Sequence, residues 1–107
     1  MMRAMMGKTG AWTVNITHEY DMYSGTIYIA LNGVDIGSLS GSQEGSVLSL
    51  TYQKGDIIKF YSTTWRICAS IYIDGVCIGS TNEGYNNTFE FVATKKHTIH
   101  LYINNND

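Results

Sequence analysis

Proline is absent from the chain, and charged residues make up only 15% of it. Without proline no turn has a fixed φ angle, so Gly, Asn and Asp must supply the turn geometry. The seven Lys and Arg are scattered along the sequence, which argues against the clustered basic surface that binds nucleic acid. No apolar run approaches the roughly 18 residues that span a bilayer. We therefore expect neither a nucleic acid nor a membrane as the partner.

The first ten residues, MMRAMMGKTG, contain four Met and one Arg but no continuous apolar segment like that of a signal peptide. We interpret residues 1–10 as a flexible N-terminal tail and predict that the protein is not exported. Residues 11–107 have the length of one domain, and 44% of the chain is hydrophobic, which is enough for a core. The sequence thus predicts a single folded domain behind a short tail.

Two similar stretches organise this domain, GTIYIALNGVDIGS at 25–38 and ASIYIDGVCIGS at 69–80. Each places a short pair, Asn32-Gly33 or Asp74-Gly75, between two runs of alternating apolar residues. Such pairs tolerate positive φ angles and favour the type I′ turn of a β-hairpin. With turns at these pairs, strand alternation predicts eight apolar side chains on one core-facing side. These side chains are Ile29, Leu31, Val34 and Ile36 in the first hairpin and Ile71, Ile73, Val76 and Ile78 in the second.

Alternation of apolar and polar residues continues through the rest of the chain. Further strands are expected at 12–20, 47–52, 57–62 and 99–103, and Phe89 and Phe91 share one face of another. No segment of useful length has helical periodicity. About nine short strands separated by turns predict an all-β fold, either a two-layer antiparallel β-sandwich or a barrel closed from the same strands.

The two cysteines fall too far apart in this register to form a disulfide. Cys77 lies opposite Tyr72, and Cys68 lies four residues further along the same strand. At about 3.3 Å per residue, that separation exceeds the limit of about 7 Å between the Cα atoms of a disulfide. We predict two free thiols in a reducing compartment, with pairing to another chain as the alternative.

The two hairpins belong to a longer internal similarity. NGVDIGS at 32–38 and DGVCIGS at 74–80 agree at five of seven positions. We interpret residues 25–63 and 67–104 as two diverged copies of one hairpin-pair unit. Neither copy can bury its apolar face alone, so we expect the copies to pack on each other through a pseudo-twofold axis.

The second copy contains IYIDG at 71–75, IGST at 78–81 and KKHTIHL at 95–101. These segments resemble the PEGA repeat, which is a small β-sandwich appendage of surface and envelope proteins. The resemblance implies a β-sandwich without catalytic activity. More broadly, a short, proline-free β chain rich in Gly, Ser, Thr and Asn is similar to many bacteriophage structural and accessory proteins. That similarity implies a location in the virion or in the host cytoplasm.

Few residue patterns point to catalysis or to metal binding. His97 and His100 are three residues apart on a strand, so they point to opposite faces and cannot hold one metal ion together; His18 stands alone. Glu44 and Glu83 occupy equivalent loops and form the one candidate carboxylate pair for glycoside hydrolysis. The glycines occur singly at turns, so no phosphate-binding loop is present. We expect no catalytic residue, no metal and no cofactor.

The surface that faces away from the core is the best candidate for binding. In the registers above it carries Tyr28, Tyr61, Tyr72 and Tyr102, together with His100. Tyrosine combines a rigid apolar ring with a polar tip, which suits contacts to a protein or a carbohydrate. We therefore take these five residues as the candidate binding face.

Three functions fit these observations. The first, which we predict, is a non-enzymatic structural or binding module that forms a homo-oligomer through its edge strands or its tyrosines. A tail, baseplate or capsid accessory component of a bacteriophage particle is of this kind. The second is a small phage-encoded inhibitor that binds a host defence protein or a signalling molecule. The third, a sugar-acting enzyme, rests only on Glu44 and Glu83.

Overall fold

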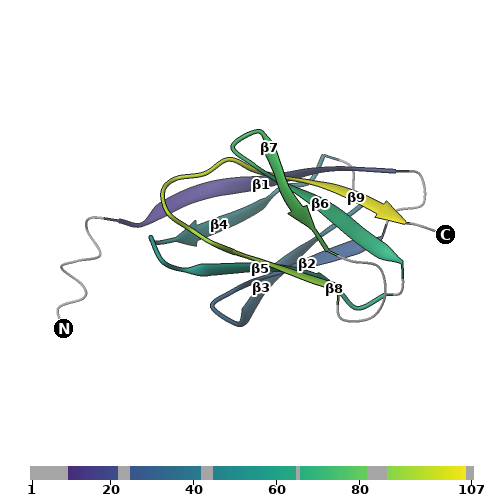
Figure 1. Ribbon diagram of the computed structural model, residues 1–107, viewed down its shortest axis with the longest axis horizontal. Coiled ribbons are helices and arrows are strands. Elements are labelled where there is room, and N and C mark those ends of the chain that lie inside the picture. The colour runs from purple at the N-terminus through teal and green to yellow at the C-terminus, as the bar shows by residue number, and fades with distance from the viewer. Residues whose placement is uncertain (1–9, 22–24, 42–44, 65, 82–86, 106–107) are drawn as a thin grey trace.

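The structure is a computed structural model that describes residues 10–21, 25–41, 45–64, 66–81 and 87–105. In this part of the chain nine strands form two layers (Figure 1). The five-stranded sheet has the order β4 (Leu48–Tyr52), β1 (Trp12–Tyr20), β9 (Ile99–Asn105), β6 (Ile67–Ile73) and β7 (Val76–Ser80). The four-stranded sheet has the order β3 (Val34–Ser40), β2 (Thr26–Leu31), β5 (Ile57–Ser62) and β8 (Asn87–Val92). The described residues contain no helix and the sheets do not close into a barrel, so the predicted β-sandwich is confirmed.

One pair of neighbouring strands departs from the predicted antiparallel pattern. β1 and β9 run parallel, from Ile16 opposite Ile99 to Tyr20 opposite Ile103. Every other pairing between described strands is antiparallel. Parallel neighbours need a long connection, and here almost the whole domain lies between its first and last strands. The N-terminal strand is thereby held between β9 and β4 inside the five-stranded sheet.

The core lies between the two sheets and is built from the inward-facing residues of each strand. The largest fully buried side chains are Ile16, Leu50, Tyr52, Ile71, Ile99, Leu101 and Ile103 from the five-stranded sheet and Ile27, Ile29, Leu39, Ile58 and Phe60 from the four-stranded sheet. On β5, Ile58 and Phe60 are buried and alternate with Lys59 and Tyr61, as the sequence predicts. The alternation predicted for Ile99, Leu101 and Ile103 on β9 is also confirmed.

Both predicted hairpin turns are present. Asn32 and Gly33 have φ angles of 51° and 85°, and Asp74 and Gly75 have φ angles of 55° and 84°. Two successive residues with positive φ are the mark of a type I′ turn, whose twist matches that of the flanking strands. The dipeptides identified in the sequence therefore set the position of both turns.

Each hairpin contains a β-bulge that the sequence pattern does not predict. In the β2–β3 hairpin Ile29 opposes Gly37 rather than Ile36, so Ile36 is the extra residue on its strand. The β6–β7 hairpin has the same irregularity at the corresponding place, with Ile78 as the extra residue. The bulge changes the register of each strand halfway along its length.

The prediction that all eight hairpin side chains share one core face is therefore wrong for the four on β3 and β7. Their exposed fractions are 66% for Val34, 36% for Ile36, 62% for Val76 and 39% for Ile78. The four on β2 and β6 do pack in the core: Ile29, Ile71 and Ile73 are buried and Leu31 is partly buried. Ile36 and Ile78 leave the core face because they are the bulge residues. Val34 and Val76 keep the predicted pairing with Leu31 and Ile73, but they lie next to the turns on edge strands, where they stay exposed.

Beyond each bulge a glycine lets one sheet approach the other closely. A Cβ atom on Gly37 would lie 2.7 Å from Cδ1 of Leu48 on β4, and a Cβ atom on Gly79 would overlap the ring of Phe89 on β8. In Figure 1 the green strand β7 leaves the upper layer and descends toward β8 in the lower layer. The two sheets thus meet at both sides of the sandwich, β3 with β4 and β7 with β8.

The two hairpins occupy corresponding places in the sandwich. The β2–β3 hairpin shares its sheet with β5, and the β6–β7 hairpin shares its sheet with β9. The intervening strands β4 and β8 each belong to the sheet opposite the hairpin that precedes them. Duplication of 25–63 as 67–104 is a statement about ancestry, and it stays a prediction.

The cysteine geometry agrees with the sequence. Cys77 opposes Tyr72, and neither Cys68 nor Cys77 is in a disulfide. Of the other expectations, residues 1–9 of the tail and both loop glutamates, Glu44 and Glu83, lie outside the described residues. No helix in the described part of the chain is long and apolar enough to cross a membrane.

Candidate functional site

The outward-facing side of the five-stranded sheet carries mainly hydroxyl, amide and aromatic side chains, and we call it the polar face. It comprises Thr13, Asn15, Thr17 and Glu19 on β1, His100 and Tyr102 on β9, and Ser70 and Tyr72 on β6. Their neighbours along the strands, such as Ile16, Ile71 and Leu101, are fully buried. Strand alternation alone therefore directs these polar side chains to the surface.

The strand registers arrange the polar face in rows. Thr17 of β1 lies beside His100 of β9, which lies beside Tyr72 of β6. In the next row Glu19 lies beside Tyr102. Thr17 and His100 are 83 residues apart in sequence, so the parallel pairing of the first and last strands creates this surface.

Two adjoining hollows are cut into the polar face. The first has a volume of about 560 Å³, and its polar lining includes Thr13, Asn15, Thr17 and Lys96. The second has a volume of about 470 Å³ and is lined by Glu19, Tyr72, Gly75 and Tyr102. Both hollows also include Thr98 and His100 in their walls. We call the two hollows together the groove.

His100 stands between the two hollows in a chain of three hydrogen-bonded side chains. Its Nδ1 lies 2.7 Å from Oγ1 of Thr17, and its Nε2 lies 2.9 Å from Oε2 of Glu19. The Nε2–H donates to the carboxylate, which leaves Nδ1 to accept from the hydroxyl in the neutral ring or to donate to it in the charged ring. The ring of Tyr72 lies against the imidazole, with 6.4 Å between centroids and 59° between planes. The imidazole is thus fixed on three sides.

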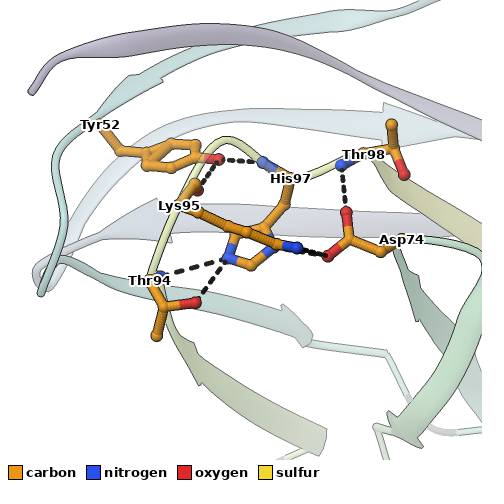
Figure 2. A network of polar contacts seen from close by, with 6 residues as sticks. All are labelled: Tyr52, Asp74, Thr94, Lys95, His97 and Thr98. Atoms are coloured by element: carbon orange, nitrogen blue, oxygen red, sulfur yellow. Dashed lines mark hydrogen bonds and ion pairs between the residues drawn. The ribbon is translucent and has the colours of Figure 1, made fainter.

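A network of polar contacts around the buried His97 holds one end of the groove in place, and Figure 2 shows its members. Nδ1 of His97 lies 2.8 Å from Oδ2 of Asp74, while Nε2 of His97 accepts from the Thr94 N–H at 3.2 Å. Because Nε2 is an acceptor, the ring proton is on Nδ1 and is donated to Asp74. The Thr98 N–H donates to Oδ1 of Asp74, and the Asp74 N–H donates to the Thr98 carbonyl, each over 2.9 Å. These bonds tie the turn before β9 to the tip of the β6–β7 hairpin.

Tyr52 holds the same turn from the inner side. Its hydroxyl donates to the Lys95 carbonyl at 2.9 Å and accepts from the His97 N–H at 2.8 Å (Figure 2). The Tyr52 ring lies in the core and stacks near the His97 ring, with 6.4 Å between centroids. A core residue of β4 therefore fixes a turn that forms part of the groove wall.

Two groups in this network have shifted pKa values. The hydrogen bonds from His97 and from the Thr98 N–H favour the ionised carboxylate and hold the pKa of Asp74 below its ordinary value. Burial disfavours the phenolate and raises the pKa of Tyr52. At neutral pH the network therefore contains a carboxylate and a neutral phenol, which suits the hydrogen bonds observed.

The five sequence-predicted binding residues lie on two opposite faces of the sandwich. Tyr72, His100 and Tyr102 come together on the polar face and line its second hollow. Tyr28 and Tyr61 belong to the four-stranded sheet, where they stack with 5.4 Å between ring centroids. Strand alternation points all five outward, but the two sheets turn their outer faces in opposite directions. The candidate binding face is therefore two surfaces.

In the tyrosine pair on the four-stranded sheet, Tyr61 already interacts with side chains of neighbouring strands. The Tyr61 hydroxyl donates to Oδ1 of Asp35 at 2.8 Å, and this bond raises the pKa of Tyr61. Nζ of Lys59 lies 5.1 Å from the centroid of the Tyr61 ring, which is cation–π distance. This face has no counterpart of the groove among the hollows described above, so we consider the polar face the better candidate site.

No protein-family model, curated protein or solved structure matches this chain. The resemblance of the second copy to the PEGA repeat therefore stays a prediction. The function has to be argued from the groove itself.

The three histidines have separate surroundings, and in the described residues no group of three or more His, Cys, Asp or Glu side chains is placed to hold a metal ion. His97 does not share a strand with His100 as predicted: it lies in the turn before β9 with its ring buried, whereas His100 lies on the outward side of β9. His18 points inward, and its Nε2–H donates to the Ser40 carbonyl at 3.1 Å. The carboxylate pair considered for glycoside hydrolysis, Glu44 and Glu83, lies outside the described residues.

Sequence reasoning missed the β1 side of the groove. Thr13, Asn15, Thr17 and Glu19 alternate with apolar residues, which marks them as outward-facing. Nothing in the sequence places them beside β9, because parallel pairing of distant strands leaves no local pattern. The turn-anchoring role of Asp74 was equally hidden, since the Asp-Gly pair is fully explained by the hairpin turn.

Proposed function

We propose that the protein is a non-enzymatic structural module that associates with copies of itself, as a component of a bacteriophage particle does. The observation that carries this proposal is the exposure of apolar side chains at matching positions of the two edge hairpins. Val34 and Val76 follow the two turns directly, and Ile36 and Ile78 are the two bulge residues. We call these four side chains the hairpin patches.

The edge strands that carry the hairpin patches have little of the usual protection against association. β7 has the sequence VCIGS and contains no charged residue, and β3 has one charge, Asp35. Natural edge strands are commonly protected by lysine, by proline or by bulges. Only the bulges are present here, and they interrupt the backbone ladder beside Ile36 and Ile78. We therefore infer contact through side-chain packing between hairpins rather than extension of a sheet.

Burial of the hairpin patches supplies the driving force. Covering an exposed Val or Ile side chain contributes on the order of 1–2 kcal/mol, so four such side chains in a symmetric contact favour association substantially. Small proteins mostly form closed symmetric oligomers. We expect a dimer or a small ring that places like hairpins together.

The test is light scattering coupled to size exclusion at micromolar concentration, on the wild type and on two lysine variants. Ile78→Lys places a charge in a hairpin patch and should shift the protein to a monomer. Ile57→Lys is the matched control, because Ile57 has the same exposed fraction, 39%, as Ile78 and belongs to neither hairpin patch. It lies on β5, in the sheet opposite β7, and only its backbone bonds Asn32 of the β2–β3 turn. Ile57→Lys should leave the oligomer intact.

A strictly monomeric wild type would contradict the proposal. It would favour the second candidate, a small phage-encoded inhibitor that binds a host defence protein or a signalling molecule. An oligomer that Ile57→Lys disrupts and Ile78→Lys does not would move the interface to the Tyr28 and Tyr61 face. Gene neighbourhood separates the two candidate functions independently, since particle genes support the first and a cluster of small early genes supports the second.

A further inference from the structure

We propose that the groove on the polar face binds a neutral oligosaccharide, with one sugar unit in each hollow. This inference does not depend on self-association, because the hairpin patches and the groove are made of different residues. The groove offers the two kinds of contact that a sugar needs, which are an aromatic surface for its C–H faces and side chains that both donate and accept hydrogen bonds for its hydroxyl groups.

The aromatic contact comes from the second hollow. Tyr72 and Tyr102 line it from neighbouring strands, one row apart. A tyrosine ring presents an apolar face and a polar tip at low cost in side-chain entropy, which suits a ligand that is itself apolar on one face and polar at its rim. Glu19 and His100 stand in the same hollow and supply hydrogen-bonding atoms at its edge.

The first hollow supplies hydrogen-bonding side chains. Thr13, Asn15 and Thr17 line it from alternate positions of β1. The amide of Asn15 both donates and accepts. The hydroxyl oxygens of Thr13 and Thr17 already bond Thr51 at 2.9 Å and His100 at 2.7 Å, and they keep the capacity to accept a further hydrogen bond from a sugar hydroxyl. The two hollows share Thr98 and His100 in their walls, so they are adjacent, and a chain of at least two sugar units would cross from one to the other at His100.

The charges of the groove favour a neutral ligand. Its formally charged lining side chains are Glu19, in the second hollow, and Lys96, in the first. A polyanion such as a nucleic acid or a sulfated glycan needs a run of basic side chains. One lysine opposed by one carboxylate does not provide it.

The groove is also rigid, which lowers the cost of binding. β1, β9 and β6 each have a hydrogen-bonded strand on both sides in the five-stranded sheet. Thr98 is fixed by its two hydrogen bonds to Asp74, and the imidazole of His100 is held between Thr17 and Glu19. The binding groups therefore lose little freedom when a ligand arrives.

The experiment is a titration of the full chain, followed by the amide shifts of a ¹H–¹⁵N correlation spectrum. The probes are maltohexaose, cellohexaose, xylohexaose and chitohexaose, each taken to about 10 mM, a range that detects millimolar affinity. We expect saturable shifts in β1, β6 and β9 with at least one of the four. A heparin-derived hexasaccharide serves as the anionic comparison and should bind more weakly than the best neutral probe.

Three variants test the contacts. Tyr72→Ala should weaken binding of the best probe about tenfold or more, because aromatic anchors dominate binding energy. Tyr28→Ala is the matched control on the other sheet and should leave the affinity within about twofold. Thr17→Val keeps the shape of the side chain, removes its hydroxyl group and should also weaken binding. The dispersion of each spectrum reports whether the variant is folded.

Saturable shifts from none of the four neutral probes would overturn the inference. So would equal losses in Tyr72→Ala and Tyr28→Ala, or tighter binding of the heparin probe than of every neutral one. The Ile78→Lys variant is titrated in parallel. Sugar binding by a monomeric Ile78→Lys would support the groove on its own, and loss of binding in that variant with an intact spectrum would contradict the independence of the two surfaces.

Discussion

Nδ1 of His97 donates its proton to Oδ2 of Asp74 across 2.8 Å, and this bond joins the turn before β9 to the tip of the β6–β7 hairpin. The same Asp74 occupies the first position of the hairpin turn, with a φ of 55°. One residue therefore sets a turn and anchors a second segment beside it. The position of Thr98 in the groove wall depends on Asp74, because both backbone groups of Thr98 bond that residue.

Asp74→Asn should lower the melting temperature at neutral pH while keeping the fold, because Asn tolerates positive φ and already stands at the equivalent Asn32. The folded-state pKa of Asp74 lies below its ordinary value of 3.8. The stabilising effect of the carboxylate is therefore present above that value and is lost as the pH falls through the lowered pKa. The difference between wild type and variant should shrink steadily below about pH 4.

Thermal unfolding followed by circular dichroism between pH 2 and 7 measures this difference. Glu90→Gln removes a carboxylate from the exposed side of β8 and should follow the wild-type curve. A constant gap between Asp74→Asn and wild type at every pH would show that the ionised carboxylate is not what holds the turn.

Tyr52→Phe should cost about 1–3 kcal/mol of unfolding free energy, because two backbone groups, the Lys95 carbonyl and the His97 N–H, lose their partner. Urea unfolding measures this cost. Tyr28→Phe keeps a ring stacked on Tyr61 at the surface and should change stability by no more than about 0.5 kcal/mol. Equal effects of the two substitutions would mean that the buried hydroxyl is not structurally important.

The sequence predicted the elements of the fold well because they are local. The pairs at 32–33 and 74–75 set the two turns, and period-two alternation identified the strands and the inward side of β5, β6 and β9. These features depend on residues close together in the chain. The same is true of the separation between Cys68 and Cys77, which follows from the turn at 74–75.

The failures are non-local. Ile36 and Ile78 continue the apolar alternation perfectly, yet each becomes a bulge residue, because the next glycine must pack under a strand of the opposite sheet. The split of the tyrosines between two faces also has a non-local origin. Strand alternation predicts whether a side chain points into the core or outward, but it does not predict which of the two sheets the strand joins. Parallel pairing of β1 with β9 completed the groove, and no local pattern signals it.

Gly79→Ala should cost about 1–3 kcal/mol, because the added Cβ atom meets the ring of Phe89 and overpacking moves both edge strands. Gly37→Ala should also lower the unfolding free energy, because its added Cβ atom meets the Leu48 side chain on the other side of the sandwich. Gly10→Ala is the matched control, since nothing lies within 4 Å of its Cβ position. Denaturant midpoints compare the three variants. If all three variants were equally stable, the close packing of β7 against β8 at Gly79 would be contradicted.

The strictest test of which hairpin side chains face the core compares Ile71→Asn with Val76→Asn. The sequence pattern alone assigns both side chains to the core, whereas the structure buries Ile71 completely and exposes Val76. An amide at position 71 would be buried without a partner and would leave a cavity, which should cost about 3 kcal/mol or more. An amide at position 76 would stay in water and should change the unfolding free energy by no more than about 0.5 kcal/mol.

Urea unfolding at one fixed, submicromolar protein concentration measures both variants. The low concentration matters because self-association adds to apparent stability, and Val76 belongs to a hairpin patch. At higher concentration Val76→Asn should become less stable relative to wild type, whereas the deficit of Ile71→Asn should not depend on a second copy. A large loss for Val76→Asn at low concentration would return Val76 to the core and remove part of the exposed patches on which self-association rests.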